Sequence, residues 1–165
     1  MRRILNPYIA GAPVVEPSLF FGRQDVFDWI EHSLEGKYVD HILVIHGQRR
    51  VGKTSVLKQI PNHLSGQYIQ IFLDLQGRTL SSLDRFLWWM GREIVRTLRS
   101  QCGITISRPE LSDFSKDNEY FHTQFLPALK PILGDKTLLL TFDEFDILSQ
   151  AEVMESLGKP LTGYL

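Results

Sequence analysis

The chain has 165 residues, of which 43% are hydrophobic and 22% charged, and its formal net charge is −1. This composition is typical of a globular protein with a buried core, and the charge gives no overall attraction to nucleic acid or to an anionic membrane. The single cysteine excludes an intrachain disulfide, which suits a reducing compartment. No apolar run reaches transmembrane length and no signal-peptide core follows the first residues, so we expect a cytoplasmic protein without membrane association.

The first 23 residues contain three prolines and no periodic pattern, which predicts an irregular N-terminal arm. Aromatic side chains persist in it, among them Phe20 and Phe21. The arm either packs on the domain surface, which composition alone favours, or closes over the flat ring of a nucleotide base. Residues 24–35 then carry apolar side chains at helical spacing and predict a helix.

Residues 42–45 (ILVI) form a continuous apolar run rich in β-branched side chains. This pattern predicts a strand that is buried on both faces, as in a parallel sheet.

Residues 47–54 (GQRRVGKT), which begin two positions after this run, fit the phosphate-loop pattern G-x-x-x-x-G-K-[ST], known as Walker A. Glycines let the backbone wrap a phosphate with its N–H groups turned inward, and the positive end of the following helix faces the same anion. Lys53 would place a cation on the β- and γ-phosphates, and the Thr54 hydroxyl would ligate Mg²⁺. The alternative is a simple glycine turn, which this specific pattern disfavours. The predicted nucleotide ligands are Gly47, Gln48, Arg49, Arg50, Val51, Gly52, Lys53, Thr54 and Ser55.

The middle of the chain predicts a helix over 54–64 and a second strand over 68–73. Asp74 follows that strand within D-x-x-G, the spacing of a GTPase magnesium site. We favour a turn residue there, because the chain has no N-K-x-D sequence for reading guanine.

A long helix is predicted over 81–100, and its four arginines fall largely outside the apolar stripe. These arginines could meet a nucleic acid or an acidic partner, but a solvated helix face is the more ordinary interpretation. A polar loop is expected over 101–117. Residues 118–133 read as helical with a kink or a break, because Pro127 and Pro131 conflict with one straight helix.

A third strand is predicted over 137–142, and two acids follow it directly. Residues 138–144 thus form a Walker B pattern, in which Asp143 would hold Mg²⁺ through water and Glu144 would be the general base for the attacking water. Many buried strands end in aspartate, so the pattern gains its specificity from the phosphate loop upstream.

The two motifs together resemble the additional-strand P-loop ATPases, and most closely the AAA-like and STAND signalling ATPases, including archaeal-type and origin-recognition-like relatives. Phe20-Phe21-Gly22-Arg23 also resembles the F-x-G-R element of these proteins, which lies near the adenine. The resemblance implies a three-layer α/β/α fold with a mostly parallel sheet, ATP and Mg²⁺ as ligands, and adenine contacts from Gly22 and Arg23.

Part of the family pattern is missing, since we find no sensor strand, helical lid or arginine finger after Walker B. In the family, the strand after Walker B inserts between the Walker A and Walker B strands. We therefore expect a domain that is incomplete at its C-terminus, marginally stable and nearly inactive alone, or else a smaller sheet in which those two strands pair directly. The expected organisation is an arm over 1–23 near the nucleotide, an ATPase core over 24–148 and an irregular or truncated tail over 149–165.

The leading functional hypothesis is a Mg²⁺-dependent ATP-binding switch, hydrolytic if the domain is complete, which a protein partner or a downstream effector domain reads. The alternatives are a DNA-associated AAA-like ATPase, which the net charge does not support, a fragment that binds ATP without turnover, and a small-molecule kinase.

Overall fold

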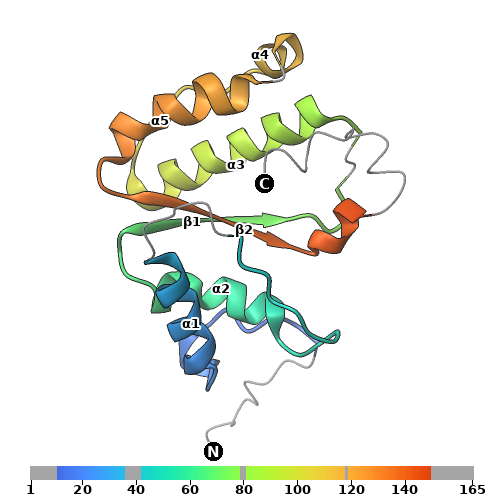
Figure 1. Cartoon of the computed structure of the whole chain (residues 1–165), viewed down its shortest axis with the longest axis vertical. Helices are drawn as coiled ribbons and strands as arrows, with labels where there is room; N and C mark the ends of the chain where they lie inside the picture. The colour runs from blue at the N-terminus through green and yellow to red at the C-terminus, as the bar shows by residue number, and fades with distance from the viewer. Residues whose placement is uncertain (1–10, 36–41, 79–80, 118, 150–165) are drawn as a thin grey trace, which may run out of the picture. The chain divides into compact units, whose positions relative to one another are not determined.

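The computed structural model describes residues 11–35, 42–78, 81–117 and 119–149 (Figure 1). The chain divides into two compact units, an N-terminal unit over 1–66 and a C-terminal unit over 67–165. The predicted tail lies outside the described residues apart from residue 149, and so do the first ten residues of the predicted arm.

The N-terminal unit contains a short 3-10 turn and two helices: η1 (Pro17–Leu19), α1 (Gln24–Leu34) and α2 (Lys53–His63). Both helix predictions are confirmed. The Phe27 and His63 rings stack at 3.9 Å between centroids, and Phe20 meets Phe27 edge-on at 5.8 Å. These rings tie the arm and the two helices into one small apolar cluster.

The predicted strand over 42–45 is wrong. Those residues belong to no strand, and two of their side chains are exposed, Ile42 at 59% and Val44 at 55%. An apolar sequence becomes a strand only when a neighbouring strand accepts and donates its backbone hydrogen bonds. No described segment pairs with these residues, so the run remains extended chain leading into the loop. The alternative in which the Walker A and Walker B strands pair directly is not observed either.

The C-terminal unit is built on two parallel strands, β1 (Tyr68–Asp74) and β2 (Thr137–Asp143), and both strand predictions are confirmed. The register pairs Tyr68 with Thr137 at one end and Asp74 with Asp143 at the other. Parallel neighbours need a long crossover connection, and here that connection is helical. It comprises α3 (Leu83–Cys102), α4 (Leu111–Lys116), the π-helical turn η2 (Phe121–Phe125) and α5 (Leu126–Leu133); the 3-10 turn η3 (Phe145–Ser149) follows β2.

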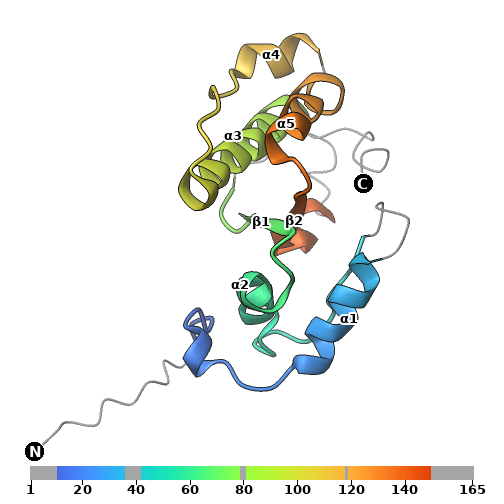
Figure 2. The same ribbon diagram turned by 90° about the vertical axis from the view of Figure 1, so that its left-hand side faces the viewer.

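Helices α3, α4 and α5 all lie on the same side of the β1–β2 pair (Figure 2). The α/β fold class with a parallel sheet is thereby confirmed. The core of this unit joins β1, α3 and the π-helical segment. Its buried members include Ile71, Leu73, Leu75, Phe86, Ile94, Leu98, Phe114, Phe125 and Leu129.

Two details of the crossover differ from the sequence prediction or refine it. The loop expected over 101–117 contains α4, whose Phe114 is buried against the core. The break expected near Pro127 is the switch from η2 to α5, where the Leu126 N–H bonds the Phe121 carbonyl. A π turn widens the backbone spacing next to prolines that donate no hydrogen bond, so the helical path continues with altered pitch.

Candidate functional site

The predicted phosphate loop is an exposed turn that runs directly into α2. Gly52 caps the helix with φ of 93°, a conformation that L residues with a side chain rarely adopt. At Gly47 the requirement is space, because a Cβ there would lie 2.9 Å from Val51 Cγ2. The two glycines of the motif thus differ in what they provide: Gly52 supplies a backbone conformation, and Gly47 avoids a close contact with the Val51 side chain.

Lys53 folds back over this loop. Its Nζ donates hydrogen bonds to the carbonyl oxygens of Gly47 at 2.8 Å and Gln48 at 3.0 Å. The ammonium group is thus held at the loop by two neutral acceptors, which phosphate oxygens could replace with a stronger, charge-assisted interaction. Thr54 lies in the first turn of α2, one residue further on.

Ser55, the last residue of the predicted phosphate site, has its hydroxyl engaged elsewhere. Its Oγ accepts a hydrogen bond from the Val14 N–H at 2.9 Å, and the side chain is buried. Only its backbone N–H therefore stays a candidate for the phosphate. The contact also fixes the arm beside the helix that follows the loop.

Gly22 and Arg23 lie at the other end of the described arm, just before α1. Both adopt positive φ, 80° at Gly22 and 64° at Arg23. The Arg23 guanidinium Nη2 donates to the Val51 carbonyl at 2.9 Å, so this arginine connects the arm to the phosphate loop. Their predicted contact with adenine stays a prediction.

A cavity of about 360 Å³ lies between the arm and the beginning of α2. Phe21, one of its lining side chains, is 75% exposed and available to a ligand. Aromatic and aliphatic groups dominate the lining of this open cavity. The arm contributes Val14, Leu19, Phe20, Phe21 and Arg23, and the loop with its helix contributes Val51, Gly52, Ser55 and Val56.

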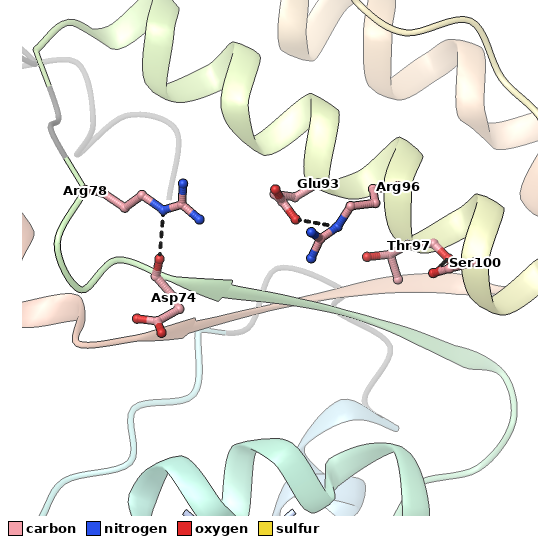
Figure 3. A network of polar contacts seen from close by, with 6 residues as sticks. All are labelled: Asp74, Arg78, Glu93, Arg96, Thr97 and Ser100. Atoms are coloured by element: carbon pink, nitrogen blue, oxygen red, sulfur yellow. Dashed lines mark hydrogen bonds and ion pairs between the residues drawn. The ribbon is translucent and has the colours of Figure 1, made fainter.

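In the C-terminal unit, the two strands end side by side in aspartates. Asp143 Oδ1 accepts the Glu144 N–H at 3.2 Å, and the Asp143 carbonyl accepts the Leu75 N–H at 3.3 Å. Asp74 Oδ1 accepts the Gln76 N–H at 2.9 Å, which is the turn role favoured for it, and its carbonyl faces Arg78 (Figure 3). The third acid, Glu144, is exposed, and its carboxylate accepts no hydrogen bond from any residue that the structure describes.

Backbone strain marks the predicted site residues. Among the described residues, the non-glycine residues with positive φ are Arg23 at 64°, Arg50 at 67° and Glu144 at 55°. They fall in the arm element, the predicted phosphate loop and the predicted Walker B segment, one in each. Strained conformations of this kind persist where the surroundings impose them and gather at functional sites.

The predicted magnesium site requires oxygen ligands from the protein. No group of three or more His, Cys, Asp or Glu side chains gathers around a metal position in the described part of the chain. Mg²⁺ in nucleotide sites takes most of its ligands from water and substrate phosphates, with one or two protein oxygens. The hydroxyl of Thr54 in α2 and the carboxylate of Asp143 at the end of β2 are each oxygen donors of the kind that Mg²⁺ takes, and their joint role stays a prediction.

Sequence reasoning missed one buried polar residue in this region. Gln59 is 0% exposed and its Nε2 donates to the carbonyl oxygens of Val14 at 3.2 Å and Val15 at 2.8 Å. The signal was available, because Gln59 lies on the same helical face as Val56 and Ile60, where an apolar residue would be expected.

The chain matches a known protein family. Residues 20–165 match the model of an ATPase domain that occurs predominantly in Archaea, so the match includes residues of both units. No curated protein and no solved structure matches the chain. Within the described residues, no helix combines the length and apolarity that crossing a membrane requires. The phosphate-loop sequence, the parallel α/β fold and the family match agree, and the chain belongs to this archaeal-type family of P-loop ATPases, whose substrate is ATP.

Proposed function

We propose that this chain binds Mg-ATP at residues 47–54 and hydrolyses it as a nucleotide-dependent switch. The observation that carries the proposal is the exposed loop ending in left-handed Gly52, with the Lys53 ammonium held over its carbonyl oxygens at 2.8 and 3.0 Å. This arrangement offers backbone N–H groups, a helix N-terminus and a side-chain cation to one anion. A triphosphate is the ligand that uses all three.

Each residue has a distinct role in this proposal. Lys53 exchanges its bonds to the loop carbonyls for bonds to the β- and γ-phosphates. Thr54 and Asp143 would hold Mg²⁺, which neutralises charge on the phosphates when bound. Glu144 accepts a proton from the attacking water as the bond between the γ-phosphorus and the β–γ bridging oxygen breaks, so that ADP and phosphate leave.

The cavity beside the arm is the proposed site of the adenine ring. It adjoins Gly52 and Ser55, so a ligand whose phosphates occupy the loop has its base within reach of Phe21 and Val14. Flat aromatic ligands gain from such apolar and aromatic surroundings. This position also gives Gly22 and Arg23 their proposed role beside the base.

The switch is proposed to act on a protein partner or an effector domain, as in the AAA-like and STAND ATPases that the motifs resemble. One observation supports a DNA-associated ATPase as second candidate. Helix α3 exposes all four of its arginines, and at about 100° per residue they fall within an arc of about 60°. Within the described residues, only Arg96 among them forms an ion pair, with Glu93 at 3.1 Å (Figure 3). The stripe consists of Arg85, Arg92, Arg96 and Arg99.

The test is calorimetric titration of the chain with Mg-ATP, followed by measurement of phosphate release with and without duplex DNA. Lys53→Ala should weaken ATP binding about 100-fold, because the phosphates lose their point cation. Lys130→Ala, which removes an exposed lysine from α5, is the matched control and should leave affinity unchanged. Equal affinity in the wild type and Lys53→Ala would refute the proposal, and stimulation of turnover by DNA would favour the second candidate.

A further inference from the structure

The N-terminal arm is held at two places, once by α2 and once by the loop before it. At residues 14 and 15, the Val14 N–H donates to Ser55 Oγ, and Gln59 Nε2 donates to the carbonyls of both Val14 and Val15. At residue 23, the arginine side chain donates to the carbonyl of Val51 in the loop before the helix. The segment between these anchors carries η1 and the aromatic wall of the cavity.

Gln59 is the central residue of the first anchor. Its side chain is fully buried, and both ends of its amide are satisfied: Nε2 by the two arm carbonyls and Oε1 by Asn62 Nδ2 at 2.9 Å. The two carbonyls require a donor, so this orientation of the amide is the only one that makes all three bonds. A buried glutamine without hydrogen-bond partners would destabilise the fold. Here both amide hydrogens of Gln59 bond to the arm.

Ser55 supplies the complementary bond. It accepts the Val14 N–H while Gln59 donates to the Val14 carbonyl, so the two side chains satisfy the whole backbone of that residue. They lie four residues apart on α2, which places them one turn apart on the same face. The same helix begins at Lys53, so the phosphate loop and the arm are held by one rigid element.

We infer that Gln59, with Ser55, is a positioning residue for the nucleoside part of the ligand: it holds the arm so that the cavity wall is in place when the triphosphate occupies the loop. The inference rests on the proposed function. Because the arm is already ordered, less conformational entropy is lost when the base binds. The consequence is that α2 has two roles: Lys53 and Thr54 at its start act on the phosphates, whereas Ser55 and Gln59 on one face act on the base through the arm.

The experiment separates these two parts by titrating each protein with Mg-ATP and with Mg-tripolyphosphate, which carries the three phosphates without a nucleoside. Gln59→Met keeps the size of the side chain but removes both donors. It should weaken ATP binding about tenfold, the scale of a lost buried hydrogen-bonding group, and leave tripolyphosphate binding within about twofold. Ser55→Ala, whose backbone N–H is retained for the phosphate, should act in the same direction with a smaller change.

Asn62→Ala is the matched control. It removes the exposed Asn62 donor to Gln59 but keeps both bonds from Gln59 to the arm, so it should leave both affinities within about twofold of wild type. A general loss of folding would lower both affinities together. If Gln59→Met does not melt cooperatively, the same two titrations on Ser55→Ala decide the question.

The possible results are distinguishable. A wild-type chain that binds neither ligand refutes the proposed function. A wild-type chain that binds ATP no more tightly than tripolyphosphate refutes base recognition by the arm and with it this inference. If wild type prefers ATP and Gln59→Met preserves that preference, Gln59 has no positioning role, although the phosphate site stands.

Discussion

The two units differ in whether an apolar stretch of sequence forms a β-strand. Residues 42–45 and residues 68–73 both predict strands, but only the second set forms one, because β2 supplies its backbone partner. The large buried cluster of the described chain belongs wholly to the C-terminal unit, whereas the N-terminal unit buries a few apolar residues around Phe27 and Ile60. The unit that carries the predicted phosphate loop is thus the one with the smaller core. Binding segments are commonly drawn from the less stable parts of a protein, whose backbone can adjust to a ligand.

This contrast predicts unequal costs for two similar truncations. Ile71→Ala, at a fully buried position of β1, should lower the free energy of unfolding by about 2–5 kcal/mol, whereas Val44→Ala should change it by about 0.5 kcal/mol or less. Denaturant unfolding of both variants measures the difference. If Ile71→Ala does not fold, Ile71→Val should still cost about 0.5–1.5 kcal/mol. A cost at Val44 equal to that at Ile71 would mean that residues 42–45 are buried in solution, and the comparison would fail.

A second prediction separates the units by function. Glu144→Gln should slow ATP hydrolysis about 10²-fold or more through loss of the general base, and should leave Mg-ATP affinity nearly intact. Single-turnover phosphate release and calorimetry measure the two effects. Glu119→Gln, at an exposed position outside the predicted motifs, is the control and should change neither. Normal turnover in Glu144→Gln would place the base elsewhere.

Sequence reasoning succeeded where the pattern is local. Helices α1, α2 and α3 and both strands were predictable from the spacing of apolar residues, and the two motifs from their fixed residue order. Pairing is not a local property, so nothing in residues 42–45 themselves could reveal that they would lack a neighbour. Helix α4 spans only Leu111–Lys116, too short for a helical period to stand out.

The candidate site was predictable to the same extent. The phosphate loop and the acids after β2 follow from sequence order, whereas the arm contacts do not, because Val14 and Gln59 lie 45 positions apart. The left-handed conformation of Arg23, Arg50 and Glu144 was also hidden, since arginine and glutamate carry no preference for it. Strain of this kind is imposed by the surrounding fold and can be found only from coordinates.

That strain gives a third prediction. Glycine adopts positive φ freely, so Glu144→Gly should be more stable than Glu144→Ala by about 1 kcal/mol, although both lose the carboxylate and hydrolysis. The opposite order is expected at Arg96, an exposed interior position of α3, where glycine should be about 1 kcal/mol less stable than alanine. Thermal melting of the four variants measures both differences. The same order at both positions would show that residue 144 is unstrained in solution.

The smallest expected effect lies at the α3–α4 contact of the C-terminal unit. Ser115 Oγ donates to Asp84 Oδ2 at 2.6 Å, and this bond, with a second from Ser82, lowers the pKa of Asp84 below its ordinary value of 3.8. A carboxyl group whose pKa is lowered by folding stabilises the fold while it is ionised, above the pKa of the unfolded chain. That stabilisation is lost as the pH falls through the lower pKa of the folded state.

Ser115→Ala should therefore lower the melting temperature by at most about 2 °C at pH 7, and the difference in melting temperature from wild type should shrink as the pH falls below about 4. Asp84→Asn is the matched control, because it removes the titrating group, and Ser115→Ala made in that background should show no such change between pH 7 and pH 3. A difference between wild type and Ser115→Ala that stays constant down to pH 2 would mean that the serine acts through packing of α4, with no part played by the charge on Asp84.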